Sequence, residues 1–554
     1  MAERTDVCIA VTPERKAMLM KPHEDVPVLI VGGSLVGLSM ALFLSHHGVP
    51  CLVVERHAGT AIHPRAAYLT QRTVELYRGV GIEKDVLAAA EREFVQNGAI
   101  VAVDSLAGHE LQYFFRYINE GAEGLSASPR IFVTQIGLEP VLRERATALG
   151  ARMRYSSEVV SLDDDGDGVT AVVRDRTTGT ESTVRARYVI AADGAHSQVR
   201  QRLGIGMLGH GSFADSVTIY FRADARALLG DRNLSVIYVV NPAMLGFFRF
   251  AIDGRSGFLA LNSALDADGL RAPTVGARAT DEDCVRYVRD ALGAPDLPVE
   301  IEDVQRWSAA AEWAERLRAG RVLLAGDSAH AMPPTGGFGG NTGVQDAHNL
   351  AWKLAHVLDG RAGDELLDTY EPERLPVARL TVEQAYTRYV SRLDPSLGSD
   401  GLHPPVDDAA IELGYRYRSA SITPDGPDDG DWHDPRTPGG GPGFRAPHLP
   451  VRRDGAEVST LDLVDGRPVL LAGPDAAAFV RAAESLSERL NVFRVGGDVA
   501  DPEGRFPAAY GIEPDGAVLI RPDGVVAWRA RTAVDDPAPA VADAMARMLC
   551  RPTA

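Results

Sequence analysis

The sequence is poor in cysteine and contains no long apolar run. Four cysteines, Cys8, Cys51, Cys284 and Cys550, are scattered over 554 residues without a C-x-x-C pair or a Cys/His cluster. This spacing argues against a disulfide framework and against a metal site, and it favours a reducing, cytoplasmic setting. No apolar stretch approaches the roughly 20 residues that a membrane-spanning helix needs, so we expect no membrane partner.

Positive charge is also scarce. The chain has 57 Lys and Arg against 76 Asp and Glu, which gives a formal net charge of −19. An acidic surface repels phosphate backbones, so we expect no nucleic-acid partner. Residues 1–25 carry charges every few positions and lack the apolar core of a signal peptide, and we predict a flexible N-terminal arm there. The hydrophobic share of 45% is that of a globular protein long enough for several domains.

A strand, a glycine turn and a helix follow the arm. In "VLIVGGSLVG", Gly32 and Gly37 occupy the first and third places of the G-x-G-x-x-G fingerprint, but Ser34 stands where a second glycine is usual. We predict a helix over 35–47 and a second strand that ends at Glu55. Such a turn presents backbone N–H groups to a phosphate, and the carboxylate accepts ribose hydroxyls. Because serine is a favoured N-cap, we expect its hydroxyl to cap the helix or to donate to a phosphate oxygen.

Two later segments also end apolar strands with an aspartate beside a glycine. "AADGAHSQVR" places Asp193 and Gly194 at a strand end, and "VLLAGDSAHAMPPTGGFGGNTG" places Asp327 before a Pro/Gly loop and a helix predicted over 342–358. Glycine lets a ligand approach the backbone, and a helix N-terminus favours negative charge. The three segments therefore predict one dinucleotide-type ligand. "DDDGDG" at 163–168 lacks the final glutamate of a calcium loop and is predicted to be a hairpin turn.

These segments, with "HPRAAYLTQRTVELYRGVGI" and "TQIGLEPVLR", resemble those of the single-component FAD-dependent aromatic hydroxylases, the family typified by para-hydroxybenzoate hydroxylase. "LGYRYRSASI" and "TPGGGPGFRAPHLPV" are similar to segments of its polyketide-tailoring branch, which includes aklavinone hydroxylase. The resemblance covers the chain from about residue 26 onward. It implies an α/β fold with a Rossmann-like FAD-binding domain (26–100, 131–205 and 300–400), an inserted mixed or antiparallel substrate-binding sheet (101–130 and 206–299), a connecting segment (401–444) and a thioredoxin-like C-terminal domain without C-x-x-C (445–554).

The resemblance implies a monooxygenase that uses FAD, NADPH and O₂, with NADH as an alternative reductant. It implies hydroxylation of a polycyclic aromatic polyketide phenol through a flavin C4a-hydroperoxide, as in antibiotic biosynthesis. We expect a monomer or a homodimer. Two other functions stay open. One is a Baeyer–Villiger or other oxidative ring-modifying reaction on the same scaffold, and the other is a flavin-binding scaffold without turnover. Product NMR and substrate-dependent NADPH oxidation separate them.

Specific residues follow from the motifs and the resemblance, although no catalytic base is named by the sequence. Arg65, Arg249 and His330 are candidates for a catalytic role. Substrate contacts are predicted for Tyr220, Arg222, Tyr238, Phe248 and Pro334. Cofactor contacts are predicted for Gly32, Ser34, Leu35, Val36, Gly37, Glu55, Arg56, Arg65, Arg72, Gln135, Asp193, Gly194, Asp327, Pro334, Gly339, Gly340, Asn341 and Thr342.

Overall fold

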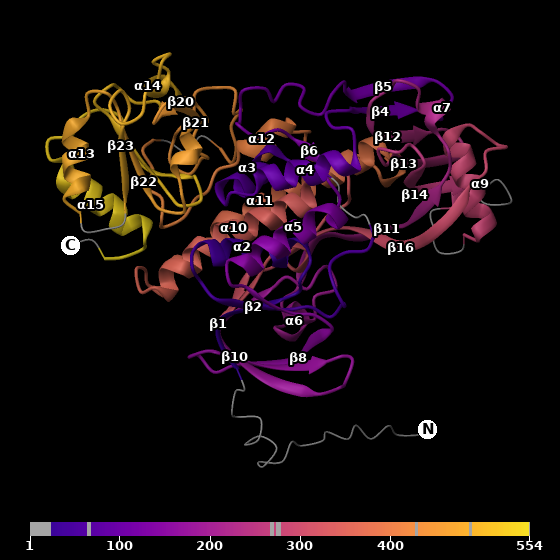
Figure 1. Cartoon of the computed structure of the whole chain (residues 1–554), viewed down its shortest axis with the longest axis horizontal. Helices are drawn as coiled ribbons and strands as arrows, with labels where there is room; N and C mark the ends of the chain where they lie inside the picture. Colours follow the sequence, from indigo (N-terminus) through magenta and orange to yellow (C-terminus); the bar gives the residue numbers. More distant parts are fainter. Residues whose placement is uncertain are drawn as a thin grey trace, which may run out of the picture.

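A computed structural model describes residues 24–63, 68–265, 271–272, 279–426, 430–486 and 490–552. Figure 1 shows a parallel sheet at the bottom centre, a second sheet at the right and a smaller domain at the upper left, with two long helices between them. The predicted fold class is confirmed. The first strand begins at Glu24, two residues before the predicted domain boundary, and the rest of the predicted arm lies outside the described residues. In the described ranges we find no helix of the length and hydropathy that crossing a bilayer requires.

The first sheet is mainly parallel and has the strand order β17-β18-β10-β1-β2-β7, with the β8–β9 hairpin attached to β10. Val28, Leu29 and Ile30 of β1 are fully buried, as expected for a parallel strand covered on both faces. The predicted hairpin at 163–168 is confirmed as the β8–β9 turn. The strands are β1 (Glu24–Val31), β2 (Cys51–Val54), β7 (Arg152–Arg154), β8 (Ser157–Asp164), β9 (Val169–Asp175), β10 (Glu181–Ala191), β17 (Arg318–Ala319) and β18 (Val322–Leu324).

Helices cover this sheet, and two of them carry the predicted cofactor motifs. Helix α2 ends at His46, one residue before its predicted end. Helix α10 begins at Phe338, four residues before its predicted start, because Gly336 and Gly337 take positive φ while the next glycines continue the helix. The helices are α2 (Leu35–His46), α3 (Gln71–Gly79), α4 (Glu83–Glu93), α5 (Gln135–Ala148), α6 (Gln198–Arg202), α10 (Phe338–Leu358) and α11 (Tyr370–Arg392).

The second sheet is mostly antiparallel, with the order β19-β16-β11-β14-β13-β12-β4-β5 and β15 beside β14. Strand β16 pairs with β11 from Met207↔Ala314 to Arg222↔Glu300, so the predicted boundary at 300 is wrong and residues 300–314 belong to this sheet. Helix α9 (Asp281–Leu292) covers one face, and its side chains share a core with the strands. The strands are β4 (Ala99–Val103), β5 (Glu110–Phe115), β11 (Met207–Arg222), β12 (Leu234–Val240), β13 (Met244–Phe250), β14 (Ser256–Leu265), β15 (Arg271–Ala272), β16 (Glu300–Ala314) and β19 (His330–Ala331).

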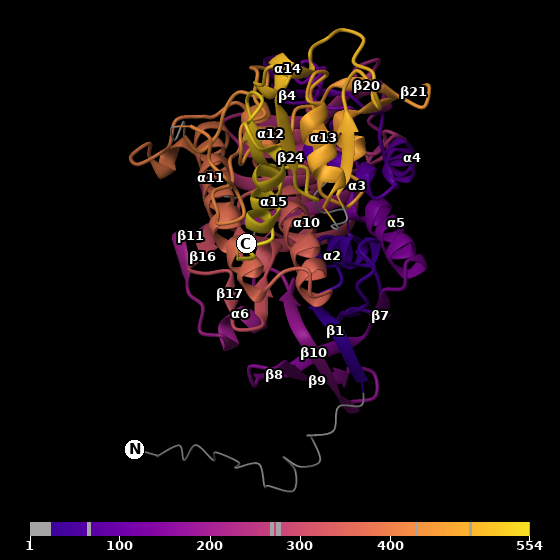
Figure 2. The ribbon, with the colours of Figure 1, turned by 90° about the vertical axis from the view of Figure 1, so that its left-hand side faces the viewer.

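The C-terminal domain is thioredoxin-like, with a four-stranded sheet in the order β23-β22-β24-β25. It lies beside α3 and α10 at the upper left of Figure 1 and faces the viewer in Figure 2. The segment before it is more than a linker, because it contains α12 (Asp408–Leu413) and buries Tyr415 and Tyr417. The domain contains β20 (Pro450–Arg453), β21 (Ala456–Ser459), β22 (Val469–Ala472), α13 (Ala477–Glu484), β23 (Asn491–Arg494), α14 (Phe506–Tyr510), β24 (Ala517–Ile520), β25 (Val526–Ala530) and α15 (Pro537–Met548).

Candidate functional site

The turn between β1 and α2 packs closely against neighbouring backbone. A Cβ at Gly32, whose φ is +104°, would lie 2.2 Å from Ala192 O, and a Cβ at Gly37 would lie 1.9 Å from Gly32 O. Only glycine fits at either position, so the first and third places of the fingerprint are sterically required. The contact with Ala192 also brings the turn against the segment that carries Asp193.

Ser34 occupies the N-cap position of α2, but its side chain does not cap the helix, so the capping alternative was wrong, and the contact with a phosphate oxygen stays a prediction. Its hydroxyl donates to Glu139 Oε1 over 2.6 Å, and Gln135 Nε2 donates to Ser34 Oγ and to Glu139 Oε1, both over 3.1 Å. Glu139 also accepts from the Ala61 backbone N–H, and burial raises the pKa of its carboxyl. The sequence reasoning missed Glu139, although it lies one helical turn after Gln135 in a quoted motif.

Glu55 stands at the end of β2, beside the same turn, and its side chain is buried. Its Oε2 accepts from the Gly33 N–H over 2.6 Å, while Oε1 accepts from the His57 N–H over 2.7 Å and lies 2.6 Å from His57 Nδ1. These bonds orient the carboxylate at the strand end where a ribose acceptor is expected. The neighbouring Arg56 side chain is exposed.

The third predicted segment packs directly on the first. A Cβ at Gly326 or at Gly343 would meet Val36 Cγ2 of α2 at 2.7 and 2.5 Å, so both glycines allow α10 and the strand end to approach α2. Asp327 is exposed at this turn. Pro334 is exposed in the loop that follows, and its carbonyl accepts from the Gly337 N–H over 3.0 Å.

Helix α10 begins at a left-handed Gly337 and has no side-chain cap among the described residues. Gly339 and Gly340 are half-buried in its first turn. Asn341 accepts from the Thr70 N–H and donates to Tyr68 O, while the Thr342 hydroxyl donates to Phe338 O. These two side chains hold the loop, and the backbone N–H groups that stay free for a ligand belong to the residues just before them in the first turn of α10.

The residues around these two helix N-termini fit FAD. Neither α2 nor α10 has an acidic residue in its first turn, and neither N-cap residue caps its helix with its own side chain, although Glu139 of α5 accepts from the Leu35 N–H at the start of α2. Uncapped N–H groups at a helix N-terminus attract anionic groups such as a diphosphate. The glycines leave room for close approach, and Glu55 supplies an acceptor. The turn of α2 brings together Gly32, Ser34, Leu35, Val36, Gly37, Glu55 and Gln135.

Other predicted cofactor residues have structural roles. Asp193 accepts from Ser197 Oγ over 2.5 Å and from the Val199 N–H over 3.1 Å, so it caps α6, and Gly194 beside it has open space. The expectation for Arg72 is corrected, because this buried side chain contacts Glu75 and donates to Asp523 O of the C-terminal domain over 2.6 Å. Arg65 lies outside the described residues.

One face of the second sheet is aromatic and only partly covered. Tyr220 and Tyr238, both predicted, lie on this face, and the Tyr220 ring contacts that of His63 in a tilted arrangement with 5.6 Å between ring centroids. Phe247, Phe258 and Trp307 on the same face are half-buried. At the rim of the face, Asn262 donates to Tyr389 Oη of α11 over 3.2 Å.

Two substrate predictions on this sheet were wrong. Phe248 is 1% exposed and packs in the core under α9, on the opposite face, because side chains alternate along β13. Arg222 lies at the exposed end of β11 and pairs with Glu302 over 2.5 Å. Phe248 is therefore directed away from the aromatic face, and the Arg222 guanidinium is held by Glu302 at the exposed strand end.

Arg249 is buried on the aromatic face between two phenyl rings. Its guanidinium carbon lies 3.3 Å from the ring centroid of Phe94 and 3.9 Å from that of Phe132. Among the described residues, Nε and Nη1 have no hydrogen-bond partner. Burial lowers the pKa of this guanidinium well below its usual value, although Glu93 acts in the opposite direction. A buried cation of this kind favours an anionic or electron-rich group beside it.

His330, the third catalytic candidate, is buried in the loop core. Its Nε2 lies 2.7 Å from Asp346 Oδ2, which also accepts from the Gly326 N–H over 3.0 Å. Its Nδ1 has no partner in the described ranges. His330 therefore stabilises the turn through Asp346. Sequence reasoning missed Asp346, because a charged residue in an amphipathic helix usually faces solvent.

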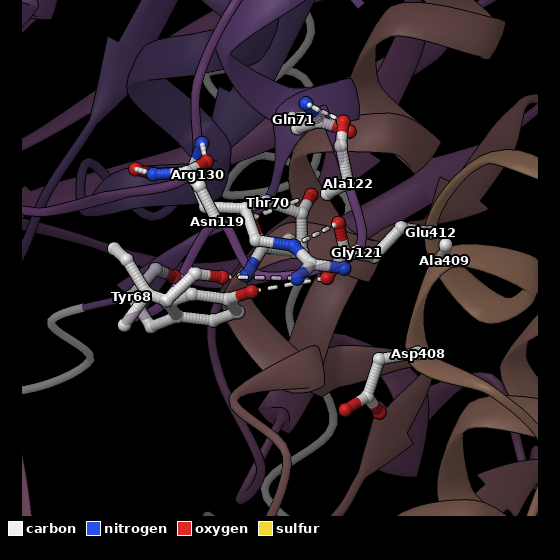
Figure 3. A network of polar contacts seen from close by, with 12 residues as sticks. Tyr68, Thr70, Gln71, Asn119, Gly121, Ala122, Arg130, Asp408, Ala409 and Glu412 are labelled. Carbon is white, nitrogen blue, oxygen red and sulfur yellow. Dashed lines mark hydrogen bonds and ion pairs between the residues drawn. The ribbon is translucent and has the colours of Figure 1, made fainter. Parts of the chain in front are cut away.

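A second buried network ties the aromatic face to the segment before the C-terminal domain. Figure 3 shows Tyr68 and Arg130 directed at Glu412 of α12, with distances of 3.0 Å from Tyr68 Oη to Oε1 and 3.0 Å from Arg130 Nε to Oε2. Burial raises the pKa of the Glu412 carboxyl, and Arg130 opposes this shift. Tyr68 also packs on Phe132 and beside Gly337, so it joins the face to the start of α10. The sequence carries no local signal for this network, since its members are far apart in the chain.

A dinucleotide-binding sheet joined to an aromatic-faced sheet defines a flavin-dependent monooxygenase that binds FAD. Residues 25–385 match the family model described as "FAD binding domain", and residues 440–552 match "Aromatic-ring hydroxylase, C-terminal". The chain belongs to this FAD-binding family of aromatic-ring hydroxylases.

Its relatives cover nearly its whole length. A 4-methyl-5-nitrocatechol 5-monooxygenase from Burkholderia sp is 51% identical over 96% of this chain and 98% of the relative. A tetracenomycin A2 monooxygenase-dioxygenase from Streptomyces glaucescens is 40% identical over 95% and 97%. The crystal structure of a ternary complex of aklavinone-11 hydroxylase with FAD and aklavinone is similar with a TM-score of 0.89 at 38% identity, over 96% of this chain and 100% of that one.

Proposed function

We propose that the protein hydroxylates a polycyclic aromatic phenol of the polyketide type, with FAD as cofactor, NADPH as reductant and O₂ as co-substrate. Relatives named for tetracenomycin A2 and aklavinone substrates support the polycyclic class. The relative named for 4-methyl-5-nitrocatechol supports a one-ring phenol, and substrate size is therefore the question to test.

The half-buried aromatic face carries this proposal. Its rings form a continuous series of ring contacts across the sheet, from Phe114 on β5, past β4, to Tyr238 and Phe247 and then to Phe258 and Tyr220. At about 4.8 Å between strands, the face extends on the order of 20 Å, which favours a flat substrate of several fused rings. Partly exposed rings also gain more from stacking on a ligand than fully covered ones do.

Arg249 is the residue on this face that fits a chemical role. FAD, once reduced, supplies the activated oxygen, and the chain has to orient the ring, exclude water and stabilise negative charge on the phenol oxygen. A buried guanidinium with unsatisfied donors lowers the free energy of a phenolate beside it. We assign Arg249 this role and assign no proton transfer to His330, whose Nε2 is engaged by Asp346.

Substrate-stimulated NADPH oxidation tests the proposal. The purified holoenzyme is assayed with hydroxylated anthraquinones and tetracenes and, in parallel, with 4-methyl-5-nitrocatechol, and products are analysed by NMR. We expect faster oxidation and a ring-hydroxylated product with the polycyclic phenols. Preference for the nitrocatechol contradicts the polycyclic class, a ring-inserted oxygen indicates a Baeyer–Villiger reaction, and no stimulation by any phenol indicates a flavin-binding scaffold.

The setting and reductant are part of the same proposal. Cys51, Cys284 and Cys550 are free thiols, which supports a reducing cytoplasm. Comparison of NADPH with NADH in the same assay tests the reductant, and sedimentation of the holoenzyme distinguishes a monomer from a homodimer.

A further inference from the structure

The tip of one C-terminal hairpin is buried inside the FAD-binding domain. Between β24 and β25, Arg521 is fully buried and Asp523 is 3% exposed. Arg521 Nη1 donates to Glu373 Oε1 over 2.5 Å and to Ser421 Oγ over 2.8 Å. Its Nη2 donates to Glu373 Oε2 over 2.8 Å and to Asp523 Oδ2, and its Nε donates to Asp523 Oδ1 over 3.0 Å. All five donors of the guanidinium are therefore satisfied at the tip.

Glu373 on α11 connects this tip to α10. Its Oε2 also accepts from Lys353 Nζ and from Asn349 Nδ2, both over 2.7 Å, and both donors belong to α10. Arg521 and Lys353 together hold the pKa of Glu373 below its usual value in spite of burial. Since every charge in the cluster is buried, losing one partner leaves another uncompensated.

The next residue of α11 extends the connection to the flavin turn. Arg374 Nε donates to Asp346 Oδ1 over 2.7 Å, and Arg374 Nη2 donates to Thr342 O over 3.0 Å. Asp346 in turn holds His330 Nε2 and the Gly326 N–H. The contacts of Arg374 therefore end at the first turn of α10 and at the strand end that packs against α2.

The partners on α10 form a single stripe of the helix. Thr342, Asp346, Asn349 and Lys353 follow one another at spacings of four, three and four residues, so they lie on the same face. All four are buried, and the stripe is polar where paired helices usually carry apolar residues. Because hydrogen bonds are directional, they set the rotation of α10 about its axis more strictly than apolar packing does.

We infer that Arg521 and Asp523 are positioning residues for the N-terminal turn of α10. The C-terminal domain holds Glu373 through them, and the α11 and α10 contacts transmit that position to the backbone that receives FAD. This inference rests on the assignment of the α10 turn to the flavin site. The inference assigns to the C-terminal domain, which lacks C-x-x-C, the role of positioning a helix of the FAD-binding domain.

Arg521→Lys tests the inference, because lysine keeps the charge but loses the fork that joins Glu373 to Asp523. The matched control is Asp462→Asn. Asp462 pairs with Arg78 Nε and Nη2 over 2.7 and 2.8 Å across the same domain boundary, on α3. Both variants weaken domain docking, and only the first removes a contact that leads to α10.

Two readouts are measured on the full-length protein. Hydrogen exchange of the amides at 339–345 is followed in the apoprotein, and the FAD dissociation constant is measured by fluorescence. We expect Arg521→Lys to accelerate exchange in this turn and to weaken FAD binding about tenfold, within the usual range of coupling between sites. We expect Asp462→Asn to lower the melting temperature without either change.

Unchanged exchange at 339–345 in Arg521→Lys, or equal effects of the two variants, overturns the inference. If Arg521→Lys does not fold, Asp523→Asn serves in its place, since it keeps the size of the side chain and the Arg521–Glu373 pair. A third outcome is that the wild-type protein binds no FAD but Arg521→Lys still accelerates exchange at 339–345. In that case the positioning role stands, and the assignment of the α10 turn to the flavin site is refuted. The exchange readout therefore separates the two failures.

Discussion

On β13, Phe248 is 1% exposed beneath α9, whereas its neighbour Phe247 is half-buried on the opposite face of the sheet. The α9 face consists of aliphatic and aromatic side chains that share one core. The other face also has aromatic rings, but it adds Arg249 and Asn262 and is closed only in part by α11. The same strands therefore supply stability on one face and, in the proposed function, a ligand surface on the other, and their alternation keeps the two faces separate.

Phe248→Ala is the strongest test of this division. Removing a fully buried phenyl ring from the α9 face should cost about 3–5 kcal/mol of unfolding free energy. Denaturant unfolding measures the loss, and the KM for the phenol should stay near the wild-type value. Phe247→Ala is the control on the other face, where we expect a smaller loss of stability and a higher KM. Equal stability losses in the two variants contradict the division.

Arg249→Met separates activity from stability. Loss of the cation should lower kcat/KM for the phenol about 100-fold, as removal of one donor to a developing oxyanion does. Stability should be unchanged or higher, because each buried donor without a partner costs about 1–3 kcal/mol. Steady-state kinetics and thermal melting measure the two effects. A large fall in melting temperature with normal turnover assigns Arg249 to the core instead.

Acid should affect the two sheets differently. Burial lowers the pKa of His47 and His348 well below the usual value and that of His356 to about 4, and these residues lie at the end of α2 and on α10, beside the first sheet. The neutral folded forms stabilise the protein above pH 6.5. This stability falls as the pH drops from 6.5 toward 4, because the unfolded chain binds the protons first.

Hydrogen exchange between pH 7 and pH 5 measures this difference. We expect protection to fall on α10 before it falls on β13. β12, β13, β14 and α9, which supply much of the α9 core, contain no histidine. Loss of protection on β13 first would assign the acid-sensitive step to the second sheet.

Ser34→Ala should have the smallest effect. It removes the 2.6 Å hydrogen bond to Glu139, which still accepts from Gln135 and from the Ala61 and Leu35 N–H groups. We expect a loss of about 1 kcal/mol in stability and little change in the FAD dissociation constant, since the anion contact is made by backbone N–H groups. A large loss of FAD affinity would instead indicate that the Ser34 hydroxyl contacts a phosphate directly.

Short sequence motifs made the FAD-binding part of the fold predictable. Gly37 and Gly336 are required by contacts within short segments, with Gly32 O and with the Phe338 ring, so their spacing in the sequence carries the information. Gly32 and Gly326 are required by contacts with Ala192 and Val36, which only the tertiary structure brings to them. The incorrect substrate prediction at Phe248 has a different origin. Phe247, Phe248, Arg249 and Phe250 are four large residues in a row, and this run hides the period of two that would have revealed the faces.

By itself, the sequence determined the order of strands and turns, the cofactor class and the family, because these depend on short motifs and on composition. Only the tertiary structure decided which face of β13 is core, because α9 (residues 281–292) covers that face. Only the tertiary structure showed that the Ser34 hydroxyl donates to Glu139 and does not cap its own helix. It also decided that Arg521 meets Glu373 across 148 residues of chain. Such pairings depend on how elements pack, and packing leaves no periodic trace in the sequence.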